Sequence, residues 1–400
     1  MSASGGGRGP AVEVFLVFLR LGLTCFGGPV AHIGYFRREF VSRRHWLDED
    51  AFTNLLALCQ FLPGPASSQM GFSIGLLRAG AWGALAAFAG FTLPSAILLG
   101  LFARYALFFS GRAGSSVAHG LKLVAVAIVA QAVWSMAQSL CPDRRRAAIA
   151  LGGLLVTLSG SGPAAQIEVI LLGAVAGLGL CRGLPAGVAA HAVFPLSRAA
   201  GFTALCAFLA LLLLLPLLAS ITGSPGLALF NAFYRSGALV FGGGHVVLPL
   251  LRQAFVVPGW VDQGSFLAGY GAAQAVPGPL FTFAAFLGFV ARPQPHGIAG
   301  ALLGVAGIFL PGMLVLTGAL PFWEALRRSQ AAQAALRGVN AAVVGLLAGA
   351  LYNPIWTSSV ATPADFGLAA TGFLLLTRWQ APPLLVVVLS ALGGVLLAPG

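Results

Sequence analysis

The chain has 400 residues, of which 58% are hydrophobic and only 8% are charged, whereas roughly a quarter of the residues in ordinary soluble domains are charged. Apolar stretches recur along its whole length, so the composition predicts an integral membrane protein and excludes an ordinary soluble enzyme. The net charge of +12 does not indicate a nucleic-acid partner, because the arginines gather in short loops, which is the positive-inside pattern, notably at Arg37, Arg38, Arg43, Arg44 and Arg144 to Arg146.

The chain begins with a Gly/Ser-rich segment, 1–11, that is predicted to be disordered. The first apolar stretch, 12–26, carries Glu13 and Arg20, which argues against a cleaved signal peptide, because the apolar region of such a peptide is uncharged. It is therefore expected to stay as a membrane segment. Residues 35–46 interleave arginines with aromatic residues, which is typical of a helix at the cytoplasmic membrane surface.

Two apolar pieces, 51–62 and 66–77, flank the break Gln60-Phe61-Leu62-Pro63-Gly64-Pro65. Two prolines around a glycine cannot lie inside one continuous helix, because proline lacks the N–H and clashes with the preceding turn. Each piece is too short for the roughly 20 residues of a spanning helix, so the pair is predicted to be a broken span or a re-entrant hairpin. At membrane depth such a break is tolerated only where protein buries it or where it lines a watery cavity.

The rest of the first half reads as ordinary helices. In order, the pattern predicts spans at 83–109 and 119–140, a helical pair at 147–159 and 165–180, and a further span at 199–222 that follows a Pro/Gly-containing linker. The five cysteines lie apart from one another without disulfide or metal-ligand spacing. Neither a metal site nor a cofactor is expected.

The second half of the chain repeats the first. Its break, Gln274-Ala275-Val276-Pro277-Gly278-Pro279, starts 214 residues after Gln60. Further pairs follow in the same order at nearly the same offset: Arg20 with Arg235, Phe26-Gly27-Gly28 with Phe241-Gly242-Gly243, Trp46 with Trp260, Asp48 with Asp262, Gly83 with Gly300 and Pro94 with Pro311. Chance similarity between apolar segments would match only the commonest residues, so the chain is an internal duplication. The repeats are assigned to 12–182 and 226–400, with a linker and an extra membrane segment at 183–225 between them.

The arginines favour an inverted arrangement of the two copies. The loop after the first segment is rich in arginine, whereas its counterpart in the second copy has only Arg252. Likewise, the arginine run at 144–146 corresponds in the second copy to 353–365, which contains no Lys or Arg. A third pair of loops shows no bias, so a parallel arrangement stays open. The predicted fold class is an all-α polytopic membrane protein with two homologous halves, inverted repeats, Pro-Gly-Pro broken or re-entrant helices and about 10–13 membrane segments.

These duplicated motifs resemble the two-domain form of the chromate ion transporter family. The likeness rests on the Phe-Gly-Gly, Trp-x-Asp and Pro-Gly-Pro signatures in both halves and covers the chain from about Val12 to its end. The resemblance implies a multi-pass carrier of the bacterial inner membrane that exports chromate and so confers resistance to it, with sulfate as the related oxyanion. Composition and spacing by themselves do not specify chromate.

The breaks themselves predict an oxyanion site. A small oxyanion needs hydrogen-bond donors and positive potential, and helix N-termini at a break supply both through free backbone N–H groups. Pro65 and Pro279 suit the first position of a half-helix, where the missing N–H is harmless, which places Ser68 and Thr282 in the first turn. The predicted substrate-binding residues at the breaks are Gln60, Pro63, Gly64, Pro65, Ser68, Gln274, Pro277, Gly278, Pro279 and Thr282. The alternative is that the prolines only kink packed helices and the hydroxyls bond their own backbone.

Arg20 and Arg235 are the second matched pair in the predicted site. An arginine inside a membrane segment usually faces a partner or a cavity, and a guanidinium matches two oxygens of an oxyanion. The alternative for Arg20 is a structural pair with Glu13. The glycines of the other breaks, Gly27, Gly28, Gly242 and Gly243, either cradle the anion with backbone N–H groups or allow close helix packing.

His32 and His245 each follow a glycine run and are candidates for proton coupling, although a histidine in a membrane more often bridges helices. No membrane-protease, Asp-rich or Walker A motif occurs in the sequence, so no catalytic residue is expected and the chain is predicted not to be an enzyme. The expected partners are a small inorganic oxyanion and membrane lipid. A channel or a carrier of another small anion, and a homodimer, stay open.

Overall fold

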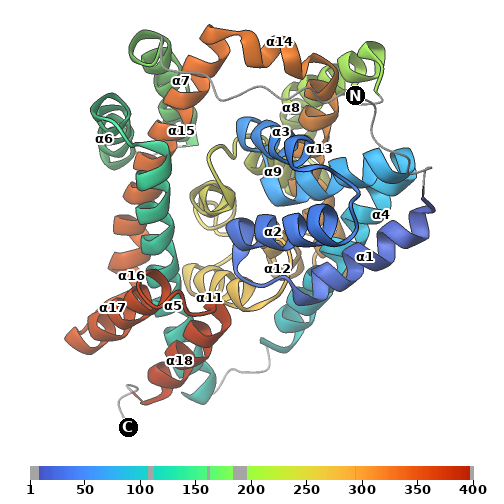
Figure 1. The fold of residues 1–400 in the computed structure, drawn as a ribbon. Helices are drawn as coiled ribbons and strands as arrows, with labels where there is room; N and C mark the ends of the chain where they lie inside the picture. The colour runs from blue at the N-terminus through green and yellow to red at the C-terminus, as the bar shows by residue number, and fades with distance from the viewer. Residues whose placement is uncertain (1–8, 107–111, 160–162, 183–195, 293, 397–400) are drawn as a thin grey trace.

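The computed structural model describes residues 9–106, 112–159, 163–182, 196–292 and 294–396, and every regular element in these ranges is a helix (Figure 1). Residues 1–8 of the predicted disordered N-terminus and 183–195 of the predicted linker lie outside the described residues. The first repeat contains α1 (Ala11–Thr24), α2 (Gly28–Phe36), the π-helix η1 (Arg37–Arg43), α3 (Glu49–Phe61), α4 (Ala66–Ala106), α5 (Arg112–Leu140), α6 (Arg144–Ser159) and α7 (Pro163–Leu180).

Helix α8 (Arg198–Thr222) connects the repeats. The second repeat contains α9 (Pro225–Ala238), η2 (Gly244–Val246), α10 (Val247–Phe255), α11 (Gln263–Ala275), η3 (Leu280–Thr282), α12 (Phe283–Val290), α13 (Gly297–Ala319), η4 (Leu320–Phe322), α14 (Trp323–Arg328), α15 (Gln330–Ala350), η5 (Leu351–Trp356), α16 (Thr357–Ser359), α17 (Pro363–Thr377) and α18 (Pro383–Leu396). The long helices follow in the same order in the two repeats, with α5 matched by α15, α6 by α17 and α7 by α18, whereas the second repeat has additional short helical turns between them.

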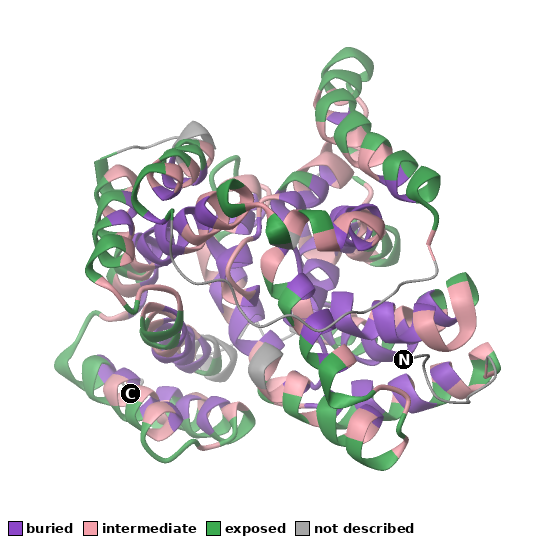
Figure 2. Ribbon diagram, turned by 45° about the horizontal axis from the view of Figure 1, so that its top comes forward, coloured by how far each residue is buried: buried purple, intermediate pink, exposed green. Residues whose placement is uncertain are grey.

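Apolar helices of membrane-spanning length confirm the predicted class. Within the described residues, five ranges are long and apolar enough to cross a membrane: Ala66–Tyr105, His119–Leu140, Arg198–Thr222, Gly297–Leu326 and Gln330–Ser359. Shorter apolar helices lie at Gln166–Leu180, Leu280–Val290, Pro363–Thr377 and Pro383–Leu396. Only 11% of the apolar window of α8 is buried, and Figure 2 shows exposed residues on the outer helix faces around a buried centre. In a membrane these outer faces contact lipid.

Helix α4 is two arms rather than one long span. Its backbone is non-helical at Ala79 and Gly80, where φ of Gly80 is 65°. A Cβ atom on Gly75 would overlap the carbonyl oxygen of Gly83, so the two arms pack closely just beyond the bend. The first arm therefore starts at the Pro-Gly-Pro break and folds back on the second at Ala79 and Gly80, which is a further bend beyond the break that the sequence predicted.

Equivalent helices exchange partners between the repeats. Helices α6 and α7 of the first repeat pack on α15 of the second, and α17 and α18 of the second pack on α5 of the first. Glycines permit both approaches, since a Cβ atom on Gly338 would overlap the carbonyl oxygen of Gly173, and one on Gly120 would overlap that of Ser390. The repeats are thus interlocked, and neither has its packing surfaces satisfied alone.

The equivalent helices α5 and α15 lie side by side and run in opposite directions (Figure 1). Helix α5 ends beside α6, and α15 starts near the same end of the molecule after α14. If both cross the membrane, a two-fold axis that relates them lies in the membrane plane. This is the geometry expected of inverted repeats.

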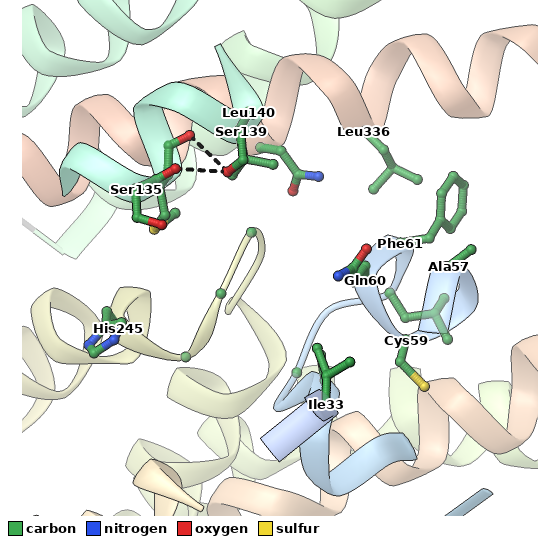
Figure 3. Close-up of a pocket in the computed structure, with 18 of the residues that line it drawn as sticks. Ile33, Ala57, Cys59, Gln60, Phe61, Ser135, Ser139, Leu140, His245 and Leu336 are labelled. Atoms are coloured by element: carbon green, nitrogen blue, oxygen red, sulfur yellow. Dashed lines mark hydrogen bonds between the residues drawn. The ribbon is translucent and has the colours of Figure 1, made fainter. Parts of the chain in front are cut away.

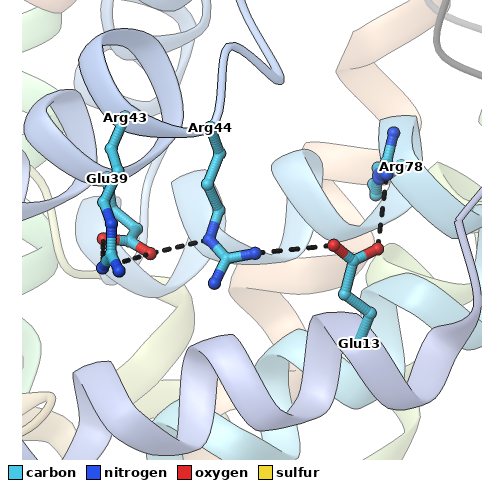
Figure 4. A network of polar contacts seen from close by, with 5 residues as sticks. All are labelled: Glu13, Glu39, Arg43, Arg44 and Arg78. Atoms are coloured by element: carbon cyan, nitrogen blue, oxygen red, sulfur yellow. Dashed lines mark hydrogen bonds and ion pairs between the residues drawn. The ribbon is translucent and has the colours of Figure 1, made fainter.

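An ion-pair network holds the first helix to its neighbours (Figure 4). Glu13 of α1 contacts Arg44 at 3.5 Å and Arg78 of α4 at 3.3 Å, so it pairs with these arginines rather than with Arg20. Arg44 also donates to Glu39 at 2.7 Å. The guanidinium carbons of Arg44 and Arg78 lie 5.5 and 5.0 Å from the ring centre of Trp46. Glu13 and Glu39 thus offset part of the positive charge of the basic segment and anchor it within the protein.

Replacing Glu39 by Gln is expected to destabilise the protein by on the order of 1 kcal/mol at neutral pH, because Arg43 and Arg44 lose their shared carboxylate. Partial burial raises the pKa of Glu39, but the hydrogen bonds from Arg44 and Arg43 outweigh it and the pKa is lowered from 4.5. This stabilisation is therefore present above the unfolded pKa and is lost as the pH falls through the folded pKa. Thermal unfolding in detergent should show a wild-type advantage at pH 7 that disappears in acid; a difference that persists unchanged at low pH would contradict the network.

Candidate functional site

Each Pro-Gly-Pro break lies against the Phe-Gly-Gly break of the other repeat. The N–H of Gly64 donates to the carbonyl of Val240 at 2.8 Å, and the N–H of Gly278 donates to the carbonyl of Cys25 at 2.9 Å. Val240 and Cys25 each stand immediately before a Phe-Gly-Gly motif. The two hydrogen bonds are equivalent under the repeat, so all four breaks meet at the centre of the molecule.

The backbone conformation and the close packing at the centre of each Pro-Gly-Pro break both require glycine. The φ angles of Gly64 and Gly278 are 119° and 103°, which L side chains rarely adopt. A Cβ atom on Gly64 would lie 2.9 Å from Cα of Gly312, and one on Gly278 would lie 2.8 Å from Oγ of Ser95. Gly312 and Ser95 each follow the matched proline of a long helix. Each break therefore packs closely against the proline-containing long helix of the other repeat.

A cavity of about 610 Å³ opens between the first Pro-Gly-Pro break and the second glycine run (Figure 3). Its wall includes Gly64 and Gln60 on one side and the loop at 242–244 on the other, and α5 and α15 complete it. The polar side chains that line it are Asn54, Gln60, Gln131, Ser135, Ser139, His245, Gln333, Arg337 and Asn340. None of the described lining residues is acidic. The cavity thus offers amides, hydroxyls and one guanidinium in an otherwise apolar surface.

Several lining groups are held in place by defined contacts. Arg337 of α15 donates to Oε1 of Gln333 at 3.2 Å and to the carbonyl of Cys181 at 3.5 Å. Nδ1 of His245 lies 2.8 Å from Oη of the buried Tyr270. The first arm of α4 begins at Ala66, which also lines the cavity, so the positive end of that helix faces the same space. These groups together favour a negative charge in the cavity.

The cavity brings together some of the residues predicted from the sequence: Gly27, Gln60, Gly64, Gly242, Gly243 and His245. Others do not line it: Arg20, Gly28, His32, Pro63, Pro65, Ser68, Arg235, Gln274, Pro277, Gly278, Pro279 and Thr282. Arg20 and Arg235 are exposed on α1 and α9.

At the second Pro-Gly-Pro break, the hydroxyl of Thr282 bonds to the nearby backbone. Oγ1 of Thr282 donates to the carbonyl of Pro279 at 2.6 Å, which is the backbone-bonding alternative considered for these hydroxyls. Pro279 has φ −71° and ψ 133° and immediately precedes η3, and Pro65 immediately precedes α4. Both prolines therefore stand one residue before the helix, rather than at its first position as predicted, and the extended ψ of Pro279 keeps it outside the helix.

His32 is fully buried beneath the breaks. Its Nε2 lies 3.2 Å from the carbonyl of Cys25, and its Nδ1 lies 3.4 Å from Oγ of Ser67. The same Cys25 carbonyl accepts from Gly278. His32 thus connects the two breaks, whereas His245 faces the cavity.

Sequence reasoning missed the contribution of α5 and α15. Gln131, Asn340 and Arg337 lie in stretches that hydropathy treats as ordinary spans. The available signal was that polar and charged residues inside a span usually face the protein interior or a water-filled cavity. Only the antiparallel pairing of the two helices shows that these side chains face the same space.

Comparison with known proteins identifies the family. The chromate transporter family matches both repeats, at residues 12–178 and 227–395. The chain belongs to the chromate transporter family. This confirms the resemblance seen in the duplicated motifs, and the chromate transporter repeats coincide with the two interlocked halves of the fold.

Individual members of the chromate transporter family match nearly the whole chain. The chain is 30% identical to a chromate transport protein of Pseudomonas aeruginosa over 95% of its length and 90% of that protein. It is 28% identical to a chromate transport protein of Cupriavidus metallidurans, covering 95% and 92% of the two chains. An uncharacterized transporter of Methanocaldococcus jannaschii is 26% identical over 97% and 94%. No solved structure matches the chain.

Replacing Gly64 by Ala is expected to destabilise the protein by about 1–3 kcal/mol, because an L residue is strained at this φ and its Cβ meets the backbone of Gly312. Gly100→Ala is the matched control, since a Cβ atom there meets nothing within 4 Å and the residue is helical. Thermal unfolding of both variants in detergent checks the prediction. Equal unfolding temperatures for the two variants would show that the close packing at Gly64 is absent.

Proposed function

We propose that this protein is a secondary carrier that binds chromate in the cavity between the first Pro-Gly-Pro break and the second glycine run. The observation that supports this proposal most directly is the lining of the cavity. It combines amide and hydroxyl donors, Arg337 and the positive end of α4, and includes no acidic residue among those described. Chromate is a tetrahedral dianion, and such a ligand is favoured by converging donors and positive potential. Relatives named chromate transport proteins support this choice of substrate.

The volume of the cavity suits a small anion that keeps part of its water. At about 30 Å³ per water molecule, 610 Å³ has room for roughly 20 waters, which is far more than one dehydrated oxyanion fills. Gln60 is exposed to this space, and Asn340 and Gln131 lie on opposite long helices. Water can therefore bridge between the anion and donors that do not reach it directly.

The finer parts of the proposal are direction, coupling and location. We propose that the protein exports chromate across a bacterial inner membrane and thereby confers resistance. His245 is the candidate for proton coupling, because it faces the cavity and hydrogen-bonds to Tyr270. The second candidate function is a carrier or channel for another small anion, such as the related anion sulfate. The lining is compatible with either anion, since it contains no group that is selective for chromium.

Arg20 and Arg235 have a different place in this proposal. Both are exposed and outside the cavity, so we propose that they attract the anion rather than bind it at the centre.

Inside-out vesicles from cells that express the protein are expected to accumulate labelled chromate, and excess sulfate should compete. Vesicles from cells without the protein are the control. Collapsing the pH gradient and the membrane potential separately identifies the coupling. Absence of any protein-dependent uptake of either anion would exclude the proposed substrates, whereas sulfate uptake without chromate uptake would favour the second candidate function.

Replacing Arg337 by Gln is expected to raise KM for chromate about 10-fold or more, because a charge-assisted hydrogen bond to the anion is lost. Arg337→Lys keeps the charge but loses the fork of donors, so an intermediate KM is expected. Arg378→Gln changes an exposed arginine at the end of α17 and serves as the control. Initial uptake rates, normalised to protein in the membrane, give the comparison; a wild-type KM in Arg337→Gln would remove Arg337 from the site.

A further inference from the structure

The first repeat contains a buried polar cluster that the second repeat lacks. We call it the α4 shell: six side chains of α4, each at most 3% exposed, at Ser67, Ser68, Gln69, Ser73, Thr92 and Ser95. The equivalent residues of the second repeat are Phe281, Thr282, Phe283, Leu287, Phe309 and Gly312. Only one of the six positions keeps a polar side chain, so helix packing in this architecture does not require the shell.

The shell lies directly behind the wall of the cavity. Nε2 of Gln69 donates to the carbonyl of Pro63 at 2.8 Å and to that of Gly312 at 2.9 Å. A Cβ atom on Gly64, which lines the cavity, would lie 2.9 Å from the same nitrogen. One residue of backbone therefore separates the shell from the space proposed to hold the anion.

The shell also reaches the second break. Oγ of Ser95 donates to the carbonyl of Thr92 at 3.0 Å. A Cβ atom on Gly278 would lie 2.8 Å from this oxygen. Ser67 contacts His32, which in turn contacts the Cys25 carbonyl that Gly278 also uses. The shell thus spans the region between the two Pro-Gly-Pro breaks.

Several polar atoms of the shell have no hydrogen-bond partner within the described residues. They are Oγ of Ser68, Oε1 of Gln69, Oγ of Ser73 and Oγ1 of Thr92. A buried polar group without a partner is unfavourable, and the second repeat shows that apolar side chains fill the same positions. The unpaired atoms leave three hydroxyls and one amide oxygen that could bind a polar species.

We propose that the α4 shell is a second station for the same oxyanion, which the anion occupies after it leaves the cavity past Gly64. This inference rests on the proposed function. The hydroxyls of Ser68, Ser73 and Thr92 donate to the anion, and the amide oxygen of Gln69 accepts from a water molecule that accompanies it. The shell contains no acidic side chain, and its members Ser67, Ser68 and Gln69 stand in the first turn of α4, at the positive end of that helix, which favours an anion over a metal cation.

The test compares Thr92→Val and Ser73→Ala with wild type by initial rates of labelled chromate uptake into inside-out vesicles. Both variants are expected to lower the maximal rate at least about 10-fold and to leave KM within about two-fold, since the cavity is untouched. Thr92→Ser keeps a hydroxyl and should retain the wild-type rate. Ser359→Ala is the matched control, because Ser359 is a buried hydroxyl without a described partner in the second repeat, and its rate should be that of wild type.

Wild-type rates in both Thr92→Val and Ser73→Ala would overturn the second station and leave the shell as packing. A rise in thermal unfolding temperature would accompany that result, because an unpaired hydroxyl has been removed. If Thr92→Val does not reach the membrane, Ser73→Ala alone decides. If the wild-type protein transports neither anion, the proposed function and this inference both fail. If the wild-type protein transports chromate and the shell variants transport it equally well, only this inference fails.

Discussion

Two hydrogen bonds between the repeats organise this molecule. The amides of Gly64 and Gly278 reach across to the carbonyls of Val240 and Cys25, so the break of each repeat is completed by the other. Without water at membrane depth, a backbone group freed by Pro-Gly-Pro needs a partner inside the protein. Duplication supplies that partner twice, and the four breaks are held together at the centre. The cavity exists because these broken segments meet there without closing completely.

The symmetry of the breaks does not extend to the side chains around them. On the cavity side, Arg337 and Asn340 of α15 face the space, whereas the equivalent positions of α5 carry His119 and Lys122. His119 instead lies 2.6 Å from the carboxylate of Asp365 and joins α5 to α17. The cavity lies at the junction of Gly64 with the second glycine run. Repeats that share a backbone plan have therefore diverged in the groups that they present to a substrate.

Much of the fold could be predicted from residues alone. The Pro-Gly-Pro and Phe-Gly-Gly motifs locate the four central breaks, because proline and glycine act on the backbone locally. The asymmetry of arginines between the repeats predicted the antiparallel course of α5 and α15. The packing of α6 and α7 on α15, and of α17 and α18 on α5, could not be predicted. It depends on contacts between glycines that are far apart in the sequence, such as Gly173 and Gly338.

The composition of the site was predicted only in part. Gln60 and the glycines follow from the motifs, but Arg337, Asn340 and Gln131 are polar residues in long apolar helices, and only their tertiary pairing shows which way they face. Arg20 and Arg235 look equally strong in the sequence because the repeat matches them, and they are nevertheless exposed outside the cavity. A matched position reports a common ancestor and a common backbone. It does not by itself place a side chain in the site.

The location of the bound anion tests the central claim most directly. Chromium scatters anomalously near its absorption edge, so crystals of the protein grown with chromate would locate the anion without reference to the surrounding side chains. The account predicts an anomalous peak in the cavity between Gln60, Gly243 and Arg337, or behind Gly64 against the α4 shell. A peak confined to the outer surface beside Arg20 or Arg235, with none at the centre, would contradict it.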